Sequence, residues 1–564
     1  MVFGLSSRLP HCPHCQQTAS DFSLHNKEVE KLYMNRRLFI SFAALSAILV
    51  AQSSQAVRQQ RPKLVLLVAI DQFRYDYFPR FRTEYTGGLK MLLDRGANFV
   101  DAHLEHYPTV TAIGHSTMLT GATPAASGIV GNDWFDRASG KTVTSVTDDS
   151  VQLLNGATGA GASPRRLLVS TLGDEIKRAG WMQPKVIGMS MKDRSAILPS
   201  GHMADAAYWY DSNTGGFLSS TYYFPKLPAW VAEFNAQNNG NAYANKQWLS
   251  AAEGRVERRL APEPGKTLYT GVNASPFGND VLELFAERAI EAEKLGQRGT
   301  TDLLTISFSS NDSVGHSYGP DSPEARQVSM GVDRTLGRLF NYLDKRIGLA
   351  NVIVVMTADH GVAPVPEVLA EQNMPGGRIA PTAPQTFFDP IQQALEKRFG
   401  AGKWILYTAG SSPYFNNQLI AEKKLDPVVV QRVAAAAIAA APHVARVYTR
   451  EQLLNSRASV DKFDVRVMRG FNANRSGDLE VVLEPYWIRG TTKATHGTPY
   501  NYDNHIPLVF MGPGIQPGRY YQAAALNDAA PTLAAMLDVE IPSGSVGRVL
   551  YEMFQPARAT APAR

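Results

Sequence analysis

The sequence predicts an α/β fold with a mainly parallel central sheet and helices on both faces. Five short runs rich in apolar and β-branched residues are typical of strands that are buried on both sides, as in parallel sheets. Helical patterns lie between these runs, and strands that alternate with helices favour a parallel sheet. The predicted strands cover residues 63–70, 185–190, 303–308, 351–356 and 507–511.

Local signals predict three of the helices. The first begins at Ser163-Pro164, where Ser can cap a helix and Pro suits its first turn, and it ends at Gly180. The second covers residues 322–347, where apolar residues recur at helical spacing, and the third covers residues 527–537. These helices would cover the faces of the predicted sheet.

Two regions break the alternation of strands and helices. Residues 201–275 are rich in Tyr, Trp, Asn and Gly, and they predict hairpins and loops near the upper edge of the sheet. Residues 375–490 combine an Ala-rich helix with a strand-like segment, and they predict a small α+β subdomain. We therefore expect one large domain, residues 57–555, with these two regions as inserted cap segments, followed by a disordered tail at 556–564.

The beginning of the chain predicts export. Arg36 and Arg37 precede an apolar run that is short for a membrane span, and Ser54-Gln55-Ala56 supplies the small residues of a cleavage site. This layout is typical of a secretory signal peptide at about residues 34–56, with a buried helix or an uncleaved anchor as the alternative. Residues 1–33 would then precede the true start at Met34. We expect a periplasmic or secreted protein with no stable membrane insertion after cleavage.

The composition excludes several classes of protein. Hydrophobic residues make up 44% and charged residues 19% of the chain, which excludes wholesale disorder, collagen and coiled coil. Lys plus Arg number 56 and Asp plus Glu number 51, a bias too weak for a nucleic-acid partner. We expect a monomer that acts on small molecules.

Metal-binding residue types follow three predicted strands and precede a fourth. Parallel strands deliver the residues at their carboxyl ends to one edge of the sheet, where ligands bind. Each residue alone also suits a bland role, such as a helix cap or a surface hydrogen bond. Clustered carboxylates need compensating cations, however, and Asp with His in the absence of thiolates suits zinc. The number of ligands predicts two ions. Two-metal sites typically catalyse phosphoryl transfer. These residues are Asp71, Asp312, His316, Asp359, His360 and His496.

A candidate nucleophile lies in the segment YPTVTAIGHSTMLTG. Thr111 occupies a predicted tight turn that leads into a helix, where amide donors and the positive end of the helix dipole are available. A simple N-cap is the alternative role. A zinc ion on its oxygen would make the hydroxyl a nucleophile near neutral pH. His115, in the same segment, is expected to form hydrogen bonds rather than to bind metal.

The ordered motifs resemble the alkaline phosphatase superfamily, and they are most similar to its exported bacterial, phosphate-irrepressible type with a Thr nucleophile. The motifs are Asp71, PTVTAIGH, GIVGNDW, KDR, DSVGH, ADHG and THGTPYNYDNHIPL, and with the late helix they cover nearly the whole chain after residue 56. The resemblance implies an alkaline phosphatase-like fold, two zinc ions per chain and a phosphorylated Thr111 intermediate. It assigns Asp71, Asp359 and His360 to the zinc that activates Thr111, and Asp312, His316 and His496 to the second zinc.

The same resemblance assigns three residues to the phosphoryl oxygens. Asn132 would bind one oxygen, and Lys192 and Arg194 would clamp the others. A phosphate monoester is dianionic and has three non-bridging oxygens, so extra positively charged donors strengthen its binding. A diester is monoanionic and has a second substituent where these donors would lie. We therefore expect a phosphomonoesterase whose substrates are small phosphate monoesters.

Three other functions remain as alternatives. A nucleotide pyrophosphatase/phosphodiesterase of the same superfamily would use the same two metals, but the Lys192/Arg194 pair argues against it. A sulfatase would need a C/S-x-P-x-R motif, which the sequence lacks. A catalytically inactive phosphate-binding module would lack a ligand or the nucleophile, and neither is missing.

Overall fold

The computed structural model describes residues 61–250, 257–379, 384–455 and 461–554. The predicted signal peptide, the extension before Met34 and the tail at 556–564 lie outside the described residues. None of the described helices combines the length and the apolar character that crossing a bilayer requires.

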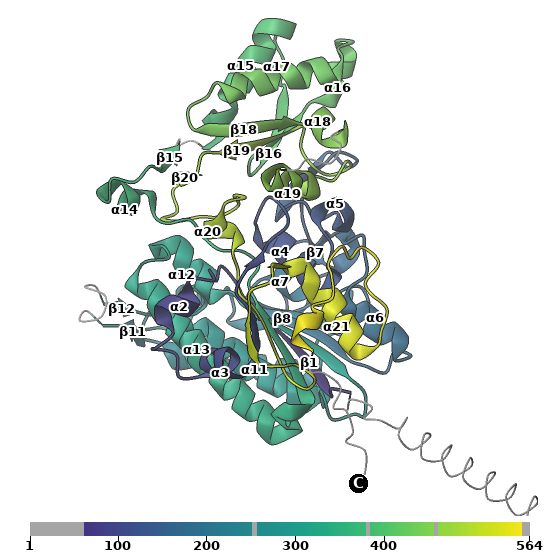
Figure 1. Cartoon of the computed structure of the whole chain (residues 1–564), viewed down its shortest axis with the longest axis vertical. Helices are drawn as coiled ribbons and strands as arrows, with labels where there is room; N and C mark the ends of the chain where they lie inside the picture. Colours follow the sequence, from purple (N-terminus) through teal and green to yellow (C-terminus); the bar gives the residue numbers. More distant parts are fainter. Residues whose placement is uncertain (1–60, 251–256, 380–383, 456–460, 555–564) are drawn as a thin grey trace, which may run out of the picture. The chain divides into compact units, whose positions relative to one another are not determined.

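The described residues form a central sheet of nine strands in the order β10-β9-β8-β13-β1-β14-β21-β2-β22 (Figure 1). Five consecutive strands of this sheet are parallel, and four of them are strands that the sequence predicts. Every residue of these five strands is buried, as expected for strands covered on both faces. They are β1 (Leu64–Ile70), β8 (Val186–Ser190), β9 (Ala206–Asp211), β13 (Asp302–Phe308) and β14 (Val352–Thr357). The predicted α/β class with a mainly parallel sheet is therefore confirmed.

One predicted parallel strand is antiparallel. β21 (Leu508–Met511) pairs with β14 in the opposite direction, with Val354 facing Met511. The chain thus enters β21 at the edge of the sheet where the parallel strands end. The segment before β21, which carries His496, therefore lies at that same edge without a crossover connection. The remaining strands of the sheet are β10 (Gly216–Leu218), β2 (Ala97–Phe99) and β22 (Gly518–Tyr520).

Helices cover both faces of the sheet (Figure 1). One group contains the long helix α13 (Pro323–Ile347), which contacts α3 (Gly88–Arg95) and α11 (Pro276–Glu293). The other group contains α4 (Thr111–Thr120), α6 (Leu172–Ala179), α7 (Asp193–Ile197) and α21 (Ala529–Leu537). α4 and α7 begin close to the ends of the parallel strands, so their first residues lie at the edge of the sheet where the candidate metal ligands are expected.

The predicted helix from Ser163 to Gly180 is two separate elements. Ser163 caps only a short 3-10 helix, η1 (Pro164–Arg166). α6 begins at Leu172, where Thr171 and Asp174 form a reciprocal capping box, and Gly180 ends it as expected. The second start signal is stronger because it satisfies two free amide groups at once. The other two predicted helices correspond to α13, capped by Ser322, and to α21 with the short turn η5 (Leu526–Asp528) before it.

The two predicted insertions differ in how they join the sheet. In the first, β9 and β10 pair antiparallel as a hairpin, as expected, but β9 also belongs to the central sheet and pairs in parallel with β8. Its buried Tyr208, Trp209 and Tyr210 are core residues. The region also contains α8 (Ala229–Gln237) and α10 (Lys266–Asn273).

The second inserted region is called the insert here and comprises the described residues 384–455 and 461–489. It has a hydrophobic cluster of its own, which includes Trp404, Ile391 and Val430. Its principal elements are α15 (Asp389–Phe399), α17 (Pro427–Ala439), α19 (Lys462–Gly470), β16 (Ile405–Ala409), β17 (Ser412–Phe415), β18 (Val444–Thr449), β19 (Leu479–Leu483) and β20 (Trp487–Arg489). α19 contacts α5 (Pro124–Ser127), so the insert lies close to the α4 end of the site.

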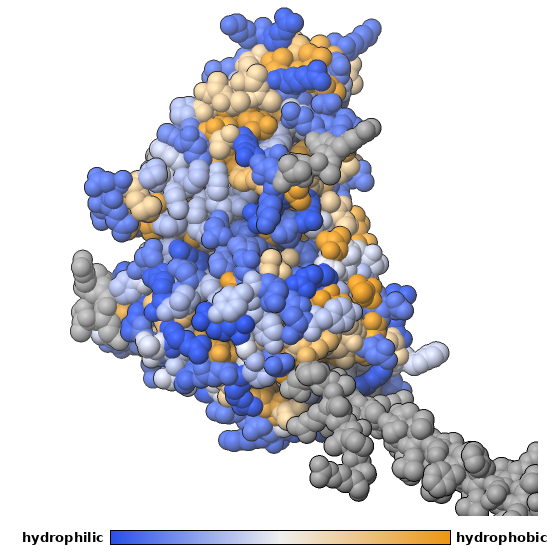
Figure 2. Space-filling view, viewed as in Figure 1, coloured by the Kyte–Doolittle hydropathy of each residue, from blue (hydrophilic) through white to orange (hydrophobic). Residues whose placement is uncertain are grey.

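The surface of the protein carries both hydrophilic and hydrophobic side chains. Figure 2 shows a face on which hydrophilic residues predominate and hydrophobic residues form scattered small patches. Single exposed apolar residues are normal on globular proteins and need no partner to explain them.

Candidate metal and phosphate site

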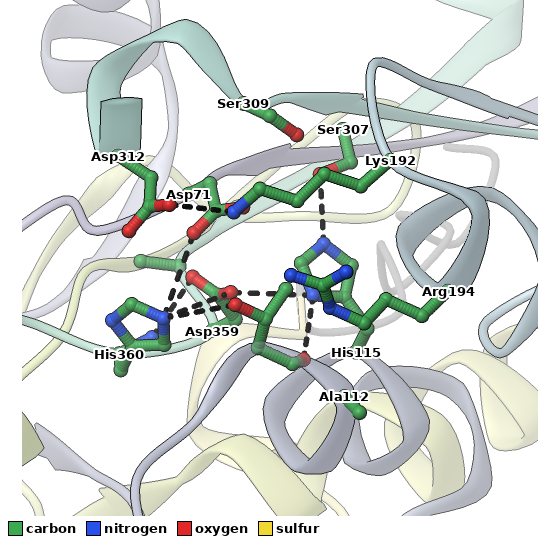
Figure 3. A network of polar contacts seen from close by, with 12 residues as sticks. Asp71, Ala112, His115, Lys192, Arg194, Ser307, Ser309, Asp312, Asp359 and His360 are labelled. Atoms are coloured by element: carbon green, nitrogen blue, oxygen red, sulfur yellow. Dashed lines mark hydrogen bonds and ion pairs between the residues drawn. The ribbon is translucent and has the colours of Figure 1, made fainter. Parts of the chain in front are cut away.

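Three adjacent strands deliver carboxylates to one edge of the sheet (Figure 3). Asp71 follows β1, Asp312 lies in α12 (Ser310–Tyr318) just after β13, and Asp359 follows β14. His360 comes next to Asp359, and its Nε2 lies 3.3 Å from Asp359 Oδ2 and 3.5 Å from Asp71 Oδ1. All four side chains are buried. The expectation that strand ends bring these residues together therefore agrees with the geometry.

Potential ligand atoms form two overlapping clusters. Asp312, His316 and His496 make one cluster, and Asp71, Asp312 and His360 make the other; within each cluster the three ligand atoms lie within 4.8 Å of one another. Asp312 Oδ1 lies 3.2 Å from His316 Nε2 and 3.8 Å from His496 Nε2. Asp312 thus belongs to both clusters, whereas the resemblance assigned it to the second zinc alone.

The three histidines are held in one tautomer by backbone carbonyls. The Nδ1 atoms of His316, His360 and His496 lie 2.8–2.9 Å from the carbonyl oxygens of Ala494, Gly361 and Thr109. A carbonyl only accepts, so each Nδ1 carries a proton, and each Nε2 faces the carboxylates. Burial also lowers the pKa of His496 well below its usual range. Asp312, in contrast, raises the pKa of His316. Where Nε2 is unprotonated, it and the carboxylate oxygens are all acceptors, and a bound cation would satisfy both.

The carboxylates carry more negative charge than the protein compensates. Burial, and then the charge of Asp359, raise the pKa of Asp71 to about 8. Asp71 Oδ1 and Asp359 Oδ2 have no hydrogen-bond partner among the described residues. Lys192 Nζ lies 2.6 Å from both Asp71 Oδ2 and Asp312 Oδ2, but it supplies a single positive charge for three carboxylates. The oxygen and imidazole donors therefore fit bound divalent cations, and this donor set suits zinc.

Thr111 begins α4 and faces the same cluster. Its Oγ1 lies 3.4 Å from His360 Nε2, and its side chain is buried. α4 rests directly on the turn that carries Asp359, because a Cβ atom at Gly114 would come within 2.3 Å of the Asp359 carbonyl oxygen. The glycine thus lets the helix N-terminus approach the candidate ligands.

His115 lies within α4 and connects this helix to β13 and to the Asp359 carboxylate. Its Nδ1 lies 2.9 Å from the Thr111 carbonyl oxygen and 3.3 Å from Asp359 Oδ2, and its Nε2 lies 2.7 Å from Ser307 Oγ. The imidazole therefore bridges the helix, the metal-facing carboxylate and β13. This arrangement agrees with the expected hydrogen-bonding role.

The three residues expected to bind phosphoryl oxygens lie close to the starts of α4 and α7. Asn132 Oδ1 accepts from the Ala112 amide at 2.9 Å, which fixes the side-chain amide at the start of α4. Lys192 caps α7 and Arg194 lies in its first turn, and both side chains extend toward the carboxylates (Figure 3). Arg194 Nε is buried without a hydrogen-bond partner among the described residues, and its Nη1 lies 3.7 Å from Asp193 Oδ1.

Gln72 is a site residue that the sequence analysis missed. Its backbone amide donates to Asp359 Oδ1 at 3.1 Å, and its Nε2 donates to Asp312 Oδ1 at 2.6 Å. It adopts a left-handed conformation with φ of 60°, which turns its backbone away from the strand direction. Its place directly after Asp71 is the one sequence signal that points to it.

The fold and the cluster of candidate metal ligands fit the phosphate-ester hydrolases as a class, and comparisons with known proteins agree. Residues 65–505 match the family model described as type I phosphodiesterase / nucleotide pyrophosphatase. The alkaline phosphatase PhoV of Synechococcus elongatus is 37% identical over 88% of this chain and 93% of its own length. The alkaline phosphatase PafA of Elizabethkingia meningoseptica is 34% identical over 92% of this chain and 99% of its own length.

A solved structure supports the same relationship. The crystal structure of wild-type alkaline phosphatase PafA matches with a TM-score of 0.81 and 34% identity, covering 88% of this chain and 99% of that chain. The chain belongs to the type I phosphodiesterase / nucleotide pyrophosphatase family, within the alkaline phosphatase superfamily. The resemblance read from the motifs is therefore confirmed, and so is the prediction of an enzyme of this type.

Proposed function

We propose that the protein is a zinc-dependent alkaline phosphatase that hydrolyses phosphate monoesters through a phosphorylated Thr111. One observation carries the proposal, namely the Thr111 hydroxyl at a helix N-terminus beside buried carboxylates and imidazoles, with Lys192 and Arg194 close by. The names of the relatives PhoV and PafA support the monoesterase activity.

The candidate ligands divide into two sets. Asp71, Asp359 and His360 would hold the ion next to Thr111. Bound zinc would supply Lewis acidity that lowers the pKa of a hydroxyl and offsets charge on phosphate oxygens. The second ion would be held by Asp312, His316 and His496.

The residues of the chain perform the transfer in two displacements. Thr111 Oγ attacks phosphorus in line, an Oγ–P bond forms, the P–O bond to the alcohol breaks, and the alcohol leaves with a proton. Water then attacks the same phosphorus, the Oγ–P bond breaks, and Thr111 regains its proton as inorganic phosphate leaves. Asn132, Lys192 and Arg194 hold the equatorial oxygens throughout. Positioning and charge dominate such a reaction because its transition state is loose.

Substitution of Thr111 tests the covalent step. We expect Thr111→Ala to lower kcat by at least about a thousandfold while metal content stays unchanged, since removal of a nucleophile typically costs this much or more. Thr111→Ser should keep much of the activity. Acid-quenched turnover followed by peptide mass spectrometry should find phosphate on Thr111. Wild-type turnover by Thr111→Ala would contradict the covalent route.

The remaining expectations belong to the same proposal. We propose export through residues 34–56, a monomeric catalytic domain at 57–555 and zinc as the resident metal. N-terminal sequencing of the exported protein, light scattering and metal analysis test the three points separately. The alternative of a pyrophosphatase/phosphodiesterase is favoured by the description of the matched family, and substrate comparison decides between the two.

A further inference from the structure

A cavity of about 290 Å³ lies between the phosphate site and the insert. Asn132 and His496 line it, so it adjoins both the expected phosphoryl-binding amide and the candidate metal cluster. Ser411, Glu480 and Arg489 of the insert also line it. The cavity is therefore shared by the catalytic residues and by a region that takes no part in the metal site.

Glu480 is an unpaired carboxylate in this lining. It lies on β19, its side chain is buried, and Ser412 Oγ donates to its Oε2 at 2.5 Å. No Lys or Arg among the described residues forms an ion pair with it, and burial raises its pKa to about 7. A buried acid without a cation costs folding free energy, so Glu480 is poorly explained as a residue that stabilises the fold.

Arg489 is the complementary unpaired cation. It lies on β20, donates to the Gly410 carbonyl oxygen, and packs 4.9 Å and 5.2 Å over the rings of Phe387 and Phe388. No described carboxylate pairs with it, and it forms no ion pair with Glu480. The lining thus offers a carboxyl group and a guanidinium group at separate points, neither of them in an ion pair, which suits a ligand that carries several neutral polar groups.

The position and size of the cavity identify the ligand further. Asn132 is fixed beside Thr111 by the Ala112 amide, so an ester phosphorylating Thr111 can direct its alcohol part into the adjoining cavity. Its volume lies at the lower end of the roughly 300–1,000 Å³ usual for ligand pockets. A group of monosaccharide size fits this volume better than a dinucleotide does.

We propose that this cavity binds the alcohol part of the substrate and selects neutral, polyhydroxylated alcohols of monosaccharide size, with Glu480 as the residue that accepts their hydroxyl groups. The inference rests on the proposed phosphomonoesterase function and names the substrate class of that site. A site built to bond hydroxyl groups discriminates strongly against an analogue that lacks them, because its buried polar group then stays unpaired.

The test compares two esters of similar shape, a hexose 6-phosphate and cyclohexylmethyl phosphate. Both release a primary alcohol on a six-membered ring, but only one carries hydroxyl groups. The measured quantity is kcat/KM for the hexose 6-phosphate divided by kcat/KM for cyclohexylmethyl phosphate. We expect Glu480→Gln and Glu480→Ala to lower this ratio by about tenfold or more relative to wild type. The comparison between variant and wild type cancels the intrinsic reactivities of the two esters. Glu480→Gln keeps the volume of the side chain and an acceptor for Ser412, so it remains informative if Glu480→Ala fails to fold.

Glu484→Gln is the matched control. Glu484 is exposed just beyond the same strand and faces His443 at 3.0 Å, so its substitution should leave the ratio unchanged. An unchanged ratio in Glu480→Gln, or a higher kcat/KM of wild type for choline phosphate or for a carboxylate-bearing ester, would overturn the inference while leaving the phosphatase proposal intact. Failure to hydrolyse any of these monoesters would contradict both proposals.

Discussion

At Asp312 the two ligand clusters meet, because one carboxylate lies within reach of His316, His496 and His360. The same carboxylate accepts from Lys192 and from Gln72. The consequence of losing it should therefore differ from that of losing a ligand that serves one cluster.

The first prediction concerns metal content. Asp312→Asn should lower bound metal at both positions, whereas His316→Ala should lower it at one, so that the variants retain different numbers of ions per chain. Mass spectrometry of the native proteins measures this number directly. Asp538→Asn, at an almost fully exposed carboxylate, should bind metal as wild type does. Equal metal loss in Asp312→Asn and His316→Ala would contradict the bridging position of Asp312.

Glu480 gives a second prediction, on stability and pH. Its pKa is about 7 when folded, against an ordinary 4.5, so the folded state binds the proton more tightly than the unfolded state does. Below pH 4.5 both states are protonated and there is no penalty. As the pH rises to 7 and above, the free energy of unfolding of wild type falls by about 3 kcal/mol. Glu480→Gln has no carboxyl group at this position, so its free energy of unfolding does not fall for this reason.

The measurement is the difference in Tm between Glu480→Gln and wild type at pH 5 and at pH 8.5. The variant should gain stability relative to wild type at the higher pH. A difference that is the same at both pH values would show that the carboxylate ionises freely in the folded protein.

At the scale of elements, the contact between α4 and the turn after β14 sets the distance from Thr111 to His360. Gly114 permits this contact, since its missing side chain leaves room for the Asp359 backbone. Gly114→Ala must move α4 away from the turn, because Asp359 presents backbone atoms that cannot rotate aside.

We expect Gly114→Ala to lower kcat/KM by about a hundredfold or more and to destabilise the protein by about 1–3 kcal/mol, the usual cost of overpacking. Gly271→Ala is the control, because Gly271 lies in helix α10 and its added Cβ would meet only Leu260 Cδ2, at 3.2 Å. Activity and Tm of both variants test the expectation. A Gly114→Ala enzyme with wild-type kcat/KM would contradict the role of this contact.

Some elements could be predicted from sequence and others could not, for physical reasons. Strands such as β1 and β14 are visible because burial on both faces requires a continuous apolar run. The antiparallel direction of β21 could not be predicted, because a short apolar run looks the same whether the strand lies parallel or antiparallel to its neighbour. β9 was hidden by its aromatic residues, which suit a hairpin as well as a core strand.

The candidate site follows the same logic. The carboxylates could be predicted because each follows a buried strand, and parallel strands end at one edge. Gln72 and Glu480 could not, since their roles depend on a left-handed turn and on burial by distant segments. The functional roles of the assembled residues stay predictions.

On the scale of the whole molecule, the sheet and the insert have separate tasks. The sheet edge and α4 bring together the proposed nucleophile and the candidate metal ligands, and the insert lines a cavity beside them. The family includes both phosphodiesterases and relatives named alkaline phosphatases, so fold alone does not decide the substrate. Lys192 and Arg194 are the residues that we expect to decide it.

The most direct test of the account is kcat/KM of the zinc-loaded protein on an aryl phosphate monoester and on the matching methyl aryl diester. We predict a strong monoester preference in wild type. The double variant Lys192→Ala/Arg194→Ala should lose at least about a hundredfold on the monoester and far less on the diester, because only the monoester offers the extra charged oxygens. A diester preference in wild type, or equal losses on both esters, would contradict the account.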